Sequence, residues 1–228
     1  MKKIFIACDT SNLRKVRKIV KLTKIKKDIV GYKFGLEFFY SKFGRKFLKN
    51  FKNNNIFLDL KLNDTPNTCY KALESLKDLK NIRYVTVHIN AGQESLKAVK
   101  LASKKRRKKI KILGVTILTS LTNLSLRKLG HTKKIKELVK KQVKLAHKIG
   151  LDGIICSGHE VKYIKKISKK LEIITPGIRL KGDKSNDQKR IVTPEKAFEL
   201  GANGIVVGRS ITSGNIKNNF KKLLNSLN

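Results

Sequence analysis

The stretch Ile56-Phe57-Leu58-Asp59-Leu60-Lys61-Leu62-Asn63-Asp64 joins a buried-strand pattern directly to a group of charges. Its first residues form a short apolar, β-rich run, which is typical of a parallel strand buried on both faces. Residues two apart in a strand share a face, so we expect Asp59 and Lys61 to point the same way. Asp64 would lie just beyond the strand, in a loop. Such charges at the end of a buried strand are costly unless they are paired or functional.

Seven further runs repeat this strand pattern, and longer amphipathic segments separate them. The eight predicted strands cover residues 4–8, 29–34, 56–61, 84–88, 112–117, 153–156, 171–174 and 204–207. Helical patterns run over 12–22 and 135–149, the second ending at Gly150 like a C-cap, and Pro194 opens another helix. Eight strand–helix units in 228 residues predict one α/β domain over residues 1–228, a compact (β/α)8 TIM barrel.

The active site of such a barrel lies at the C-terminal ends of the strands. The first predicted strand leads to Asp9, the second carries Lys33, and the third carries Asp59 and Lys61. Four charges from three strands would therefore converge at one rim. These charges would form an active site, or alternatively a buried salt-bridge network whose role is only to close the barrel.

Two further motifs follow the seventh and eighth predicted strands. The first is Thr175-Pro176-Gly177-Ile178-Arg179, and the second is Gly208-Arg209. Loops at these places in barrels often bind phosphate. Gly208 would let the backbone approach an anion, and Arg209 would supply bidentate donors. The loop over 180–189 would close over the phosphate, with Gln188 reaching in.

The charge balance is strongly basic. Lysine and arginine number 54 against 16 acidic residues, a net charge of +38, which suggests nucleic acid or an anionic membrane. However, 44 of the 54 are lysines spread along the whole chain, and the one dense run, 104–109, precedes a predicted strand. We therefore interpret that run as the exposed end of a helix, and expect no specific nucleic-acid partner.

Composition and spacing argue against disordered, membrane-spanning, secreted and metal-binding classes of protein. Hydrophobic residues make up 40%, which suffices for a large core, so disorder is not expected. No stretch approaches the ~18 apolar residues of a membrane helix, and the first apolar run is too short for a signal peptide. The cysteines, Cys8, Cys69 and Cys156, lie far apart without metal-binding spacing. We expect reduced thiols, a cytoplasmic location and no membrane partner.

The motif around the third strand resembles a known family. Residues 59–68, Asp-Leu-Lys-Leu-Asn-Asp-Thr-Pro-Asn-Thr, are similar to the signature Asp-x-Lys-x-x-Asp-Ile-Pro-Asn-Thr of the orotidine 5′-phosphate decarboxylase family. The resemblance covers nearly the whole chain, including the Leu118-Thr119-Ser120 corner and Asp187-Gln188. Thr65 replaces the usual isoleucine, and Asn63 stands where many relatives carry histidine.

The resemblance implies decarboxylation of orotidine 5′-monophosphate to UMP in pyrimidine biosynthesis, without a metal ion or an organic cofactor. Lys61 would stabilise and protonate the carbanion, and Asp59 would lie near the departing carboxylate. Asp64 and Thr68 would reach into the neighbouring subunit of a homodimer with shared sites. The implied catalytic residues are Lys33, Asp59, Lys61 and Asp64. The implied substrate-binding residues are Asp9, Lys33, Asp59, Lys61, Asp64, Pro66, Thr68, Thr119, Thr122, Pro176, Arg179, Gln188, Gly208 and Arg209, with the pyrimidine edge meeting either Thr119 or Thr122.

Two other functions share parts of this pattern. Sibling enzymes with the Asp-x-Lys-x-x-Asp core, 3-keto-gulonate 6-phosphate decarboxylase and hexulose-phosphate synthase, use Mg²⁺. The continuation Pro66-Asn67-Thr68 and the pair Gln188 and Arg209 favour the nucleotide enzyme. A basic barrel that binds nucleic acid is the more distant alternative. Aromatic residues are only 7%, and no nucleic-acid-binding motif interleaves with the lysines.

Overall fold

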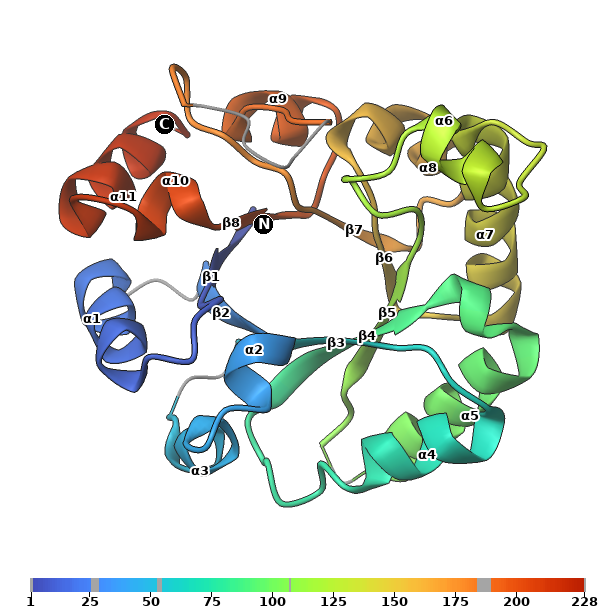
Figure 1. The fold of residues 1–228 in the computed structure, drawn as a ribbon, viewed down its shortest axis with the longest axis horizontal. Coiled ribbons are helices and arrows are strands. Elements are labelled where there is room, and N and C mark those ends of the chain that lie inside the picture. The colour runs from blue at the N-terminus through green and yellow to red at the C-terminus, as the bar shows by residue number, and fades with distance from the viewer. Residues whose placement is uncertain (1, 26–28, 53–54, 107, 184–189, 228) are drawn as a thin grey trace.

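The computed structural model describes residues 2–25, 29–52, 55–106, 108–183 and 190–227. Within these ranges, eight parallel strands close a barrel in chain order, and β8 returns to pair with β1 (Figure 1). The strands are β1 Lys3–Ala7, β2 Val30–Gly35, β3 Ile56–Leu62, β4 Ile82–His88, β5 Lys111–Val115, β6 Gly153–Ile155, β7 Glu172–Thr175 and β8 Gly204–Val207. The predicted barrel is confirmed.

Helices follow the strands and surround the barrel (Figure 1). The α-helices are α1 Leu13–Thr23, α2 Leu36–Phe39, α3 Gly44–Asn50, α4 Pro66–Glu74, α5 Gln93–Lys104, α6 Asn123–Lys128, α7 Ile135–Ile149, α8 Val161–Ile167, α9 Pro194–Glu199, α10 Arg209–Thr212 and α11 Ile216–Asn225, with short 3-10 helices η1 Ile89–Ala91 and η2 Gly158–Glu160. The helix α7 has the predicted bounds, and Gly150 caps it in the left-handed region with φ 76°. Pro194 opens α9 as predicted, after Thr193 as N-cap.

Three strands end earlier than the sequence predicts: β1 ends at Ala7 rather than Cys8, and β5 and β6 also end early. β5 pairs with β6 only as far as Val115, and the side chain of Thr116 then donates to the carbonyl of Ile155 at 3.1 Å. The backbone N–H of Thr116 donates to the same carbonyl at 3.1 Å, and Thr116 and Ile117 lie in the loop after β5. Cys156 likewise lies beyond β6. Both loops thereby bring residues to the rim of the barrel.

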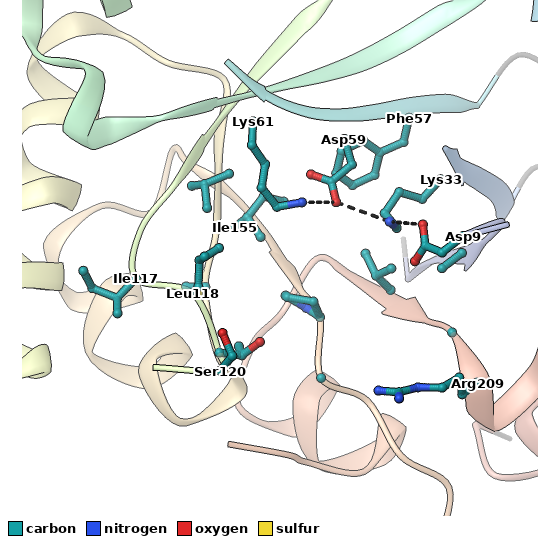
Figure 2. Close-up of a pocket in the computed structure, with 18 of the residues that line it drawn as sticks. Asp9, Lys33, Phe57, Asp59, Lys61, Ile117, Leu118, Ser120, Ile155 and Arg209 are labelled. Atoms are coloured by element: carbon teal, nitrogen blue, oxygen red, sulfur yellow. Dashed lines mark hydrogen bonds and ion pairs between the residues drawn. The ribbon is translucent and has the colours of Figure 1, made fainter. Parts of the chain in front are cut away.

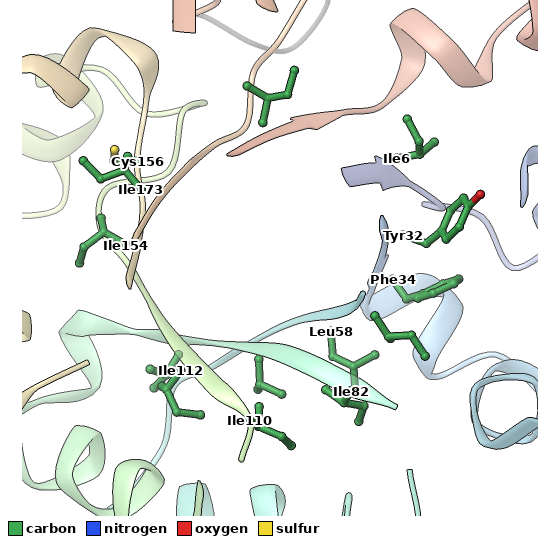
Figure 3. Close-up of a cluster of buried hydrophobic side chains, with 14 of the residues drawn as sticks. Ile6, Tyr32, Phe34, Leu58, Ile82, Ile110, Ile112, Ile154, Cys156 and Ile173 are labelled. Carbon is green, nitrogen blue, oxygen red and sulfur yellow. The ribbon is translucent and has the colours of Figure 1, made fainter. Parts of the chain in front are cut away.

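The core has two layers. Inside the barrel, the rings of Phe5, Phe57 and Tyr84 pack edge-on, with the centroids of Phe5 and Phe57 5.3 Å apart. Outside it, side chains such as Ile6, Phe34 and Ile154 point away from the barrel axis and are buried under the helices (Figure 3). The aromatic rings fill the lower barrel, and the cavity lined by Asp59 and Lys61 lies above them.

The N-terminal end of the barrel is closed by a buried ionic cluster. Glu172 forms ion pairs with Lys3 and Lys111 and accepts a hydrogen bond from the hydroxyl of Tyr84 at 3.0 Å. Burial would raise the pKa of Glu172, but the hydrogen bonds from Lys111 and Lys3 outweigh it and hold that pKa below its ordinary value. The cluster ties β1, β5 and β7 together at the end opposite the cavity.

The basic run at 104–109 follows α5, as expected. Arg106 donates to the carbonyl of Leu76 at 3.2 Å, and Lys109 pairs with Asp152 at 3.3 Å, so these two side chains serve the fold. The helices of the described ranges include none that is both long and apolar enough to cross a bilayer. All three cysteines are buried and free.

Candidate active site

A cavity of about 270 Å³ opens at the C-terminal ends of the strands. Its wall contains charged residues from β2, β3 and the loop after β1, an apolar stretch after β5, and arginines after β7 and β8. Ile117, Leu118 and Ser120 lie on one side of the cavity, and Asp9 and Arg209 lie on the other (Figure 2).

Four of these residues form a chain of alternating charges. The Lys61 ammonium lies 2.8 Å from the carboxylate of Asp59, which lies 3.3 Å from the ammonium of Lys33. Lys33 in turn lies 2.8 Å from the carboxylate of Asp9 (Figure 2). The sequence prediction that these charges converge at one rim is confirmed.

The two inner members of the chain, Lys33 and Asp59, are buried, with 7% and 8% of their surface exposed. Burial alone would lower the pKa of Lys33, but Asp59 and Asp9 together raise it above the ordinary value of 10.5. Burial would raise the pKa of Asp59, but Lys33 and Lys61 hold it below 3.8. Both groups therefore stay charged at neutral pH, each stabilised by the other.

The backbone at Lys61 departs from an ordinary strand. Lys61 has φ 48°, in the left-handed region that costs an L-residue ~1–2 kcal/mol. The pairing of β3 with β4 shifts there: Leu58 pairs with Val85, but Leu62 pairs with Val87. The Lys61 side chain still lies beside Asp59, but a bulge rather than simple strand alternation puts it there.

Thr86 supports this bulge and was missed by the sequence reasoning. Its fully buried hydroxyl donates to the carboxylate of Asp59 at 3.0 Å and accepts the backbone N–H of Lys61 at 2.8 Å. A signal was present, because alternation along β4 puts Thr86 on the same face as Tyr84, inside the barrel. A hydroxyl on an inward face requires a partner.

The predicted phosphate motifs reach the cavity from two loops. Pro176, Gly177 and Arg179 line it after β7, and Gly208 and Arg209 line it after β8. Arg179 is 6% exposed, and its guanidinium donates to the carbonyl of Ile178 at 2.9 Å. A Cβ added at Gly208 would meet only Ala7, at 3.7 Å, so packing does not require glycine there. Its missing side chain instead leaves the backbone open toward the cavity.

The structure separates the two threonines proposed for the pyrimidine. Thr119 lines the cavity, together with Ser120, which the sequence analysis named in the same corner but did not count among the substrate-binding residues. Thr122 lies outside the cavity lining, because its hydroxyl accepts the N–H of Ser125 at 3.2 Å and caps α6. A threonine three residues before a serine at a helix start could have indicated this capping role.

Three other predicted residues lie outside this cavity. Asp64 and Pro66 line a separate, open hollow beside η1 and the start of α5. Thr68 is exposed, and its hydroxyl accepts a hydrogen bond from that of Thr65 at 3.0 Å. Their assignment to a partner's site stays a prediction. Gln188 and most of the predicted phosphate loop lie outside the described residues.

Asp9 and Asp59 are the carboxylates among the described residues that line the cavity, and lysines hold both. Across the described ranges, three His, Cys, Asp or Glu side chains nowhere group together in a way that could hold a metal ion.

Comparison with known proteins identifies the family. Residues 2–220 match the orotidine 5′-phosphate decarboxylase / HUMPS family. An orotidine 5′-phosphate decarboxylase of Buchnera aphidicola subsp. Acyrthosiphon pisum is 42% identical, over 98% of this chain and 93% of that protein. The crystal structure of the enzyme from Lactobacillus acidophilus superposes with a TM-score of 0.85 at 32% identity, covering 100% of both chains. The structure of the enzyme from Methanocaldococcus jannaschii, solved with the inhibitor BMP, superposes with a TM-score of 0.78 at 27% identity, covering 100% of this chain and 99% of that one. This chain belongs to the orotidine 5′-phosphate decarboxylase / HUMPS family.

Proposed function

We propose that this chain decarboxylates orotidine 5′-monophosphate to UMP, a step of pyrimidine biosynthesis. The observation that carries the proposal is the row of alternating charges from Asp9 to Lys61, which lies beside an apolar wall in a cavity that Arg209 also lines (Figure 2). The names of the relatives support it, as does the inhibitor-bound structure from Methanocaldococcus jannaschii.

The chemistry of the reaction requires such a row of charges. When the bond from C6 to the carboxylate breaks, its electron pair stays on C6 in the plane of the ring, without a conjugated acceptor. A fixed cation must therefore stabilise the carbanion and supply a proton. The Lys61 ammonium would do both, transferring one proton from Nζ to C6 as CO2 leaves. Asp59 would hold that ammonium in place beside the departing carboxylate.

The remaining contacts would bind the non-reacting parts of the substrate. Asp9 and Lys33 would contact the ribose hydroxyls, and Thr119 the amide edge of the pyrimidine. Pro176, Arg179, Gly208 and Arg209 would surround the phosphate, with Gln188 from the adjoining loop. Binding energy from the phosphate would thus be used to hold the ring against Lys61 and Asp59.

The working unit in this proposal is a homodimer. Asp64 and Thr68 are exposed and lie outside their own cavity, which supports a role in the site of a second copy. Pro66 would fix the start of α4 that carries Thr68.

The Mg²⁺-dependent sugar-phosphate enzymes remain the nearer alternative. A divalent cation at Asp9 or Asp59 would have to displace the ammonium groups of Lys33 or Lys61, which lie within 3.3 Å of these carboxylates. The apolar stretch after β5 suits a flat ring rather than an open-chain sugar. Both features favour the nucleotide substrate.

One assay separates these functions. Purified protein is given orotidine 5′-monophosphate, and the loss of its absorbance is followed before and after exhaustive chelation with EDTA. We expect turnover that chelation leaves unchanged and that added Mg²⁺ does not raise. The same protein is tested with hexulose 6-phosphate and 3-keto-gulonate 6-phosphate, with and without Mg²⁺.

No turnover of the nucleotide would overturn the proposal, and Mg²⁺-dependent conversion of a sugar phosphate would replace it. A salt titration with DNA and RNA tests the distant alternative. Binding that depends only on counterion release would be weak and would vanish as salt rises. Tight, sequence-selective binding at physiological salt would instead support a nucleic-acid-binding barrel.

A further inference from the structure

Arg190 joins three loops at the rim of the barrel. It lies between β7 and α9, outside the cavity lining, and the side chain is 16% exposed. The reaction chemistry does not use it, and no motif in the sequence singles it out. Its contacts nevertheless reach the loops after β5, β6 and β7, all of which contribute to the cavity wall.

The guanidinium holds the loop after β5. Nη2 of Arg190 donates to the carbonyl oxygens of Ile117 and Leu118, each at 3.1 Å. These two residues line the cavity and lead directly into Thr119 and Ser120. A single nitrogen therefore fixes the backbone that would meet the pyrimidine.

The other end of the guanidinium is held by a buried carboxylate. Nη1 of Arg190 donates to Glu160, which is 2% exposed and follows β6. The second oxygen of Glu160 accepts the backbone N–H of Ser157 at 3.1 Å. Burial raises the pKa of Glu160 above its ordinary value, although Arg190 opposes this shift. A planar fork with several donors can bridge a carboxylate and two carbonyls, and a lysine ammonium cannot reproduce that geometry.

The backbone next to Arg190 holds the loop after β7. Val192 pairs with Ile178: the N–H of Arg179 donates to the carbonyl of Val192 at 3.1 Å, and the N–H of Val192 donates to that of Gly177 at 3.2 Å. A Cβ added at Gly158 would lie 2.4 Å from Cγ2 of Val192, so the loop after β6 packs directly on this segment. Any shift of residues 190–192 would therefore carry Arg179 with it.

We propose that Arg190 is a positioning residue, which sets the distance between the loop that carries Thr119 and the loop that carries Arg179. The inference rests on the proposed function, in which these loops bind the pyrimidine and the phosphate of one substrate. A ligand that spans both loops depends on their spacing. A ligand that engages only the phosphate loop does not.

The test compares two ligands in two variants. Arg190→Lys keeps the charge but loses the fork. Arg45→Lys is the matched control, because Arg45 also donates to a carboxylate, Asp78, and to a carbonyl, Ser75, both at 2.6 Å, but outside the cavity. Dissociation constants for UMP and for ribose 5-phosphate are measured by calorimetry. We expect R190K to raise the dissociation constant for UMP on the order of tenfold and to change that for ribose 5-phosphate by less than about twofold. Both dissociation constants of R45K should equal those of the wild type.

If R190K weakens the binding of both ligands equally, or weakens the binding of neither, the proposal is overturned. If R190K does not fold, the double variant R190M/E160Q takes its place, because it leaves no charge buried alone. Amide exchange of the ligand-free protein gives a reading that does not depend on the reaction. Residues 117–121 should exchange faster in the Arg190 variant than in R45K, and unchanged exchange would also contradict the role. Failure of the proposed function would appear separately, as a wild type that does not turn over orotidine 5′-monophosphate.

Discussion

At the scale of single residues, Lys61 combines a proposed chemical role with an unfavourable backbone conformation. In the proposed reaction its ammonium supplies the proton, so Lys61→Ala should lower kcat by at least about 10²–10⁴. Lys61→Gly should be equally inactive. Because glycine tolerates φ 48°, the glycine variant should be more stable than the alanine variant, by about 1 kcal/mol in urea unfolding.

Lys97 provides the matched control, because it lies inside the helix α5. There the order of stability should reverse, with Lys97→Ala more stable than Lys97→Gly by about 1 kcal/mol. An alanine variant of Lys61 that retains a tenth of the activity would remove Lys61 from the mechanism. A K61A variant more stable than K61G would show that the backbone at this position is not strained.

The pairing of Lys33 with Asp59 predicts how stability depends on pH. The pKa of Asp59 is lowered from 3.8, so its ionised form stabilises the fold above that pH, and this contribution is lost as pH falls through the lowered pKa. Lys33→Met removes the ammonium group whose charge lowers the pKa of Asp59 more than the charge of Lys61 does. This change should lower the free energy of unfolding by about 3 kcal/mol at pH 7. The difference in unfolding free energy between wild type and K33M should shrink as pH falls below 3.8.

Urea unfolding at a series of pH values, at one protein concentration, measures this difference. Lys196→Met serves as the control, since Lys196 pairs with Glu199 on the surface, where both side chains are more than half exposed. Its effect should be close to zero throughout. A difference for K33M that stays constant from neutral to strongly acidic pH would show that Asp59 is not held ionised by Lys33.

At the scale of elements, the bulge in β3 depends on one hydroxyl of β4. Thr86→Val keeps the shape of the side chain but leaves the N–H of Lys61 and one oxygen of Asp59 without their partner. We expect a loss of about 1–3 kcal/mol in unfolding free energy, and about tenfold in kcat/KM as Lys61 loses its fixed position. Thr86→Ser retains the hydroxyl and should keep most of the activity. Equal activity in both variants would contradict this role of Thr86.

The elements also show what the sequence can predict. Apolar runs and helix caps located the strands to within a few residues, because buried parallel strands and capped helices have local signatures. The positive φ of Lys61 has none, since it results from pairing with β4. The places of Thr119, in the cavity lining, and Thr122, at the start of α6, were also not distinguished by spacing alone. The contacts of Arg190 join segments about 30 and 70 residues apart, beyond the reach of local patterns.

At the scale of the whole molecule, the proposed dimer shares its active sites. In this proposal Lys61 serves its own barrel, whereas Asp64 serves that of its partner. Lys61→Ala and Asp64→Ala homodimers should each be nearly inactive. After subunit exchange of equal amounts, half of the dimers are mixed, and one of the two sites in each mixed dimer is intact. Activity should therefore recover to about one quarter of the wild-type value.

The measurement is the rate of orotidine 5′-monophosphate turnover before and after exchange, with exchange itself followed by mass spectrometry of differently tagged chains. A mixture of Lys61→Ala with Lys33→Met is the control, because both residues lie within one barrel. In that mixture each site of a mixed dimer carries one of the two changes, so activity should not recover. If the mixture of Lys61→Ala with Asp64→Ala also fails to recover although exchange is complete, Asp64 belongs to its own subunit's site.

The seam between β1 and β8 has a consequence for how the protein is made. A ribosome delivers β1 first and β8 last, so the edge of β1 that pairs with residues 204–207 has no partner for almost the whole of synthesis. Asp9 and Arg209 lie on either side of this seam. A nascent chain that stops short of β8 already holds Lys33, Asp59 and Lys61, but has an open edge and lacks Arg209. The proposed nucleotide site would therefore be completed by the last strand to leave the ribosome, in the same event that closes the barrel.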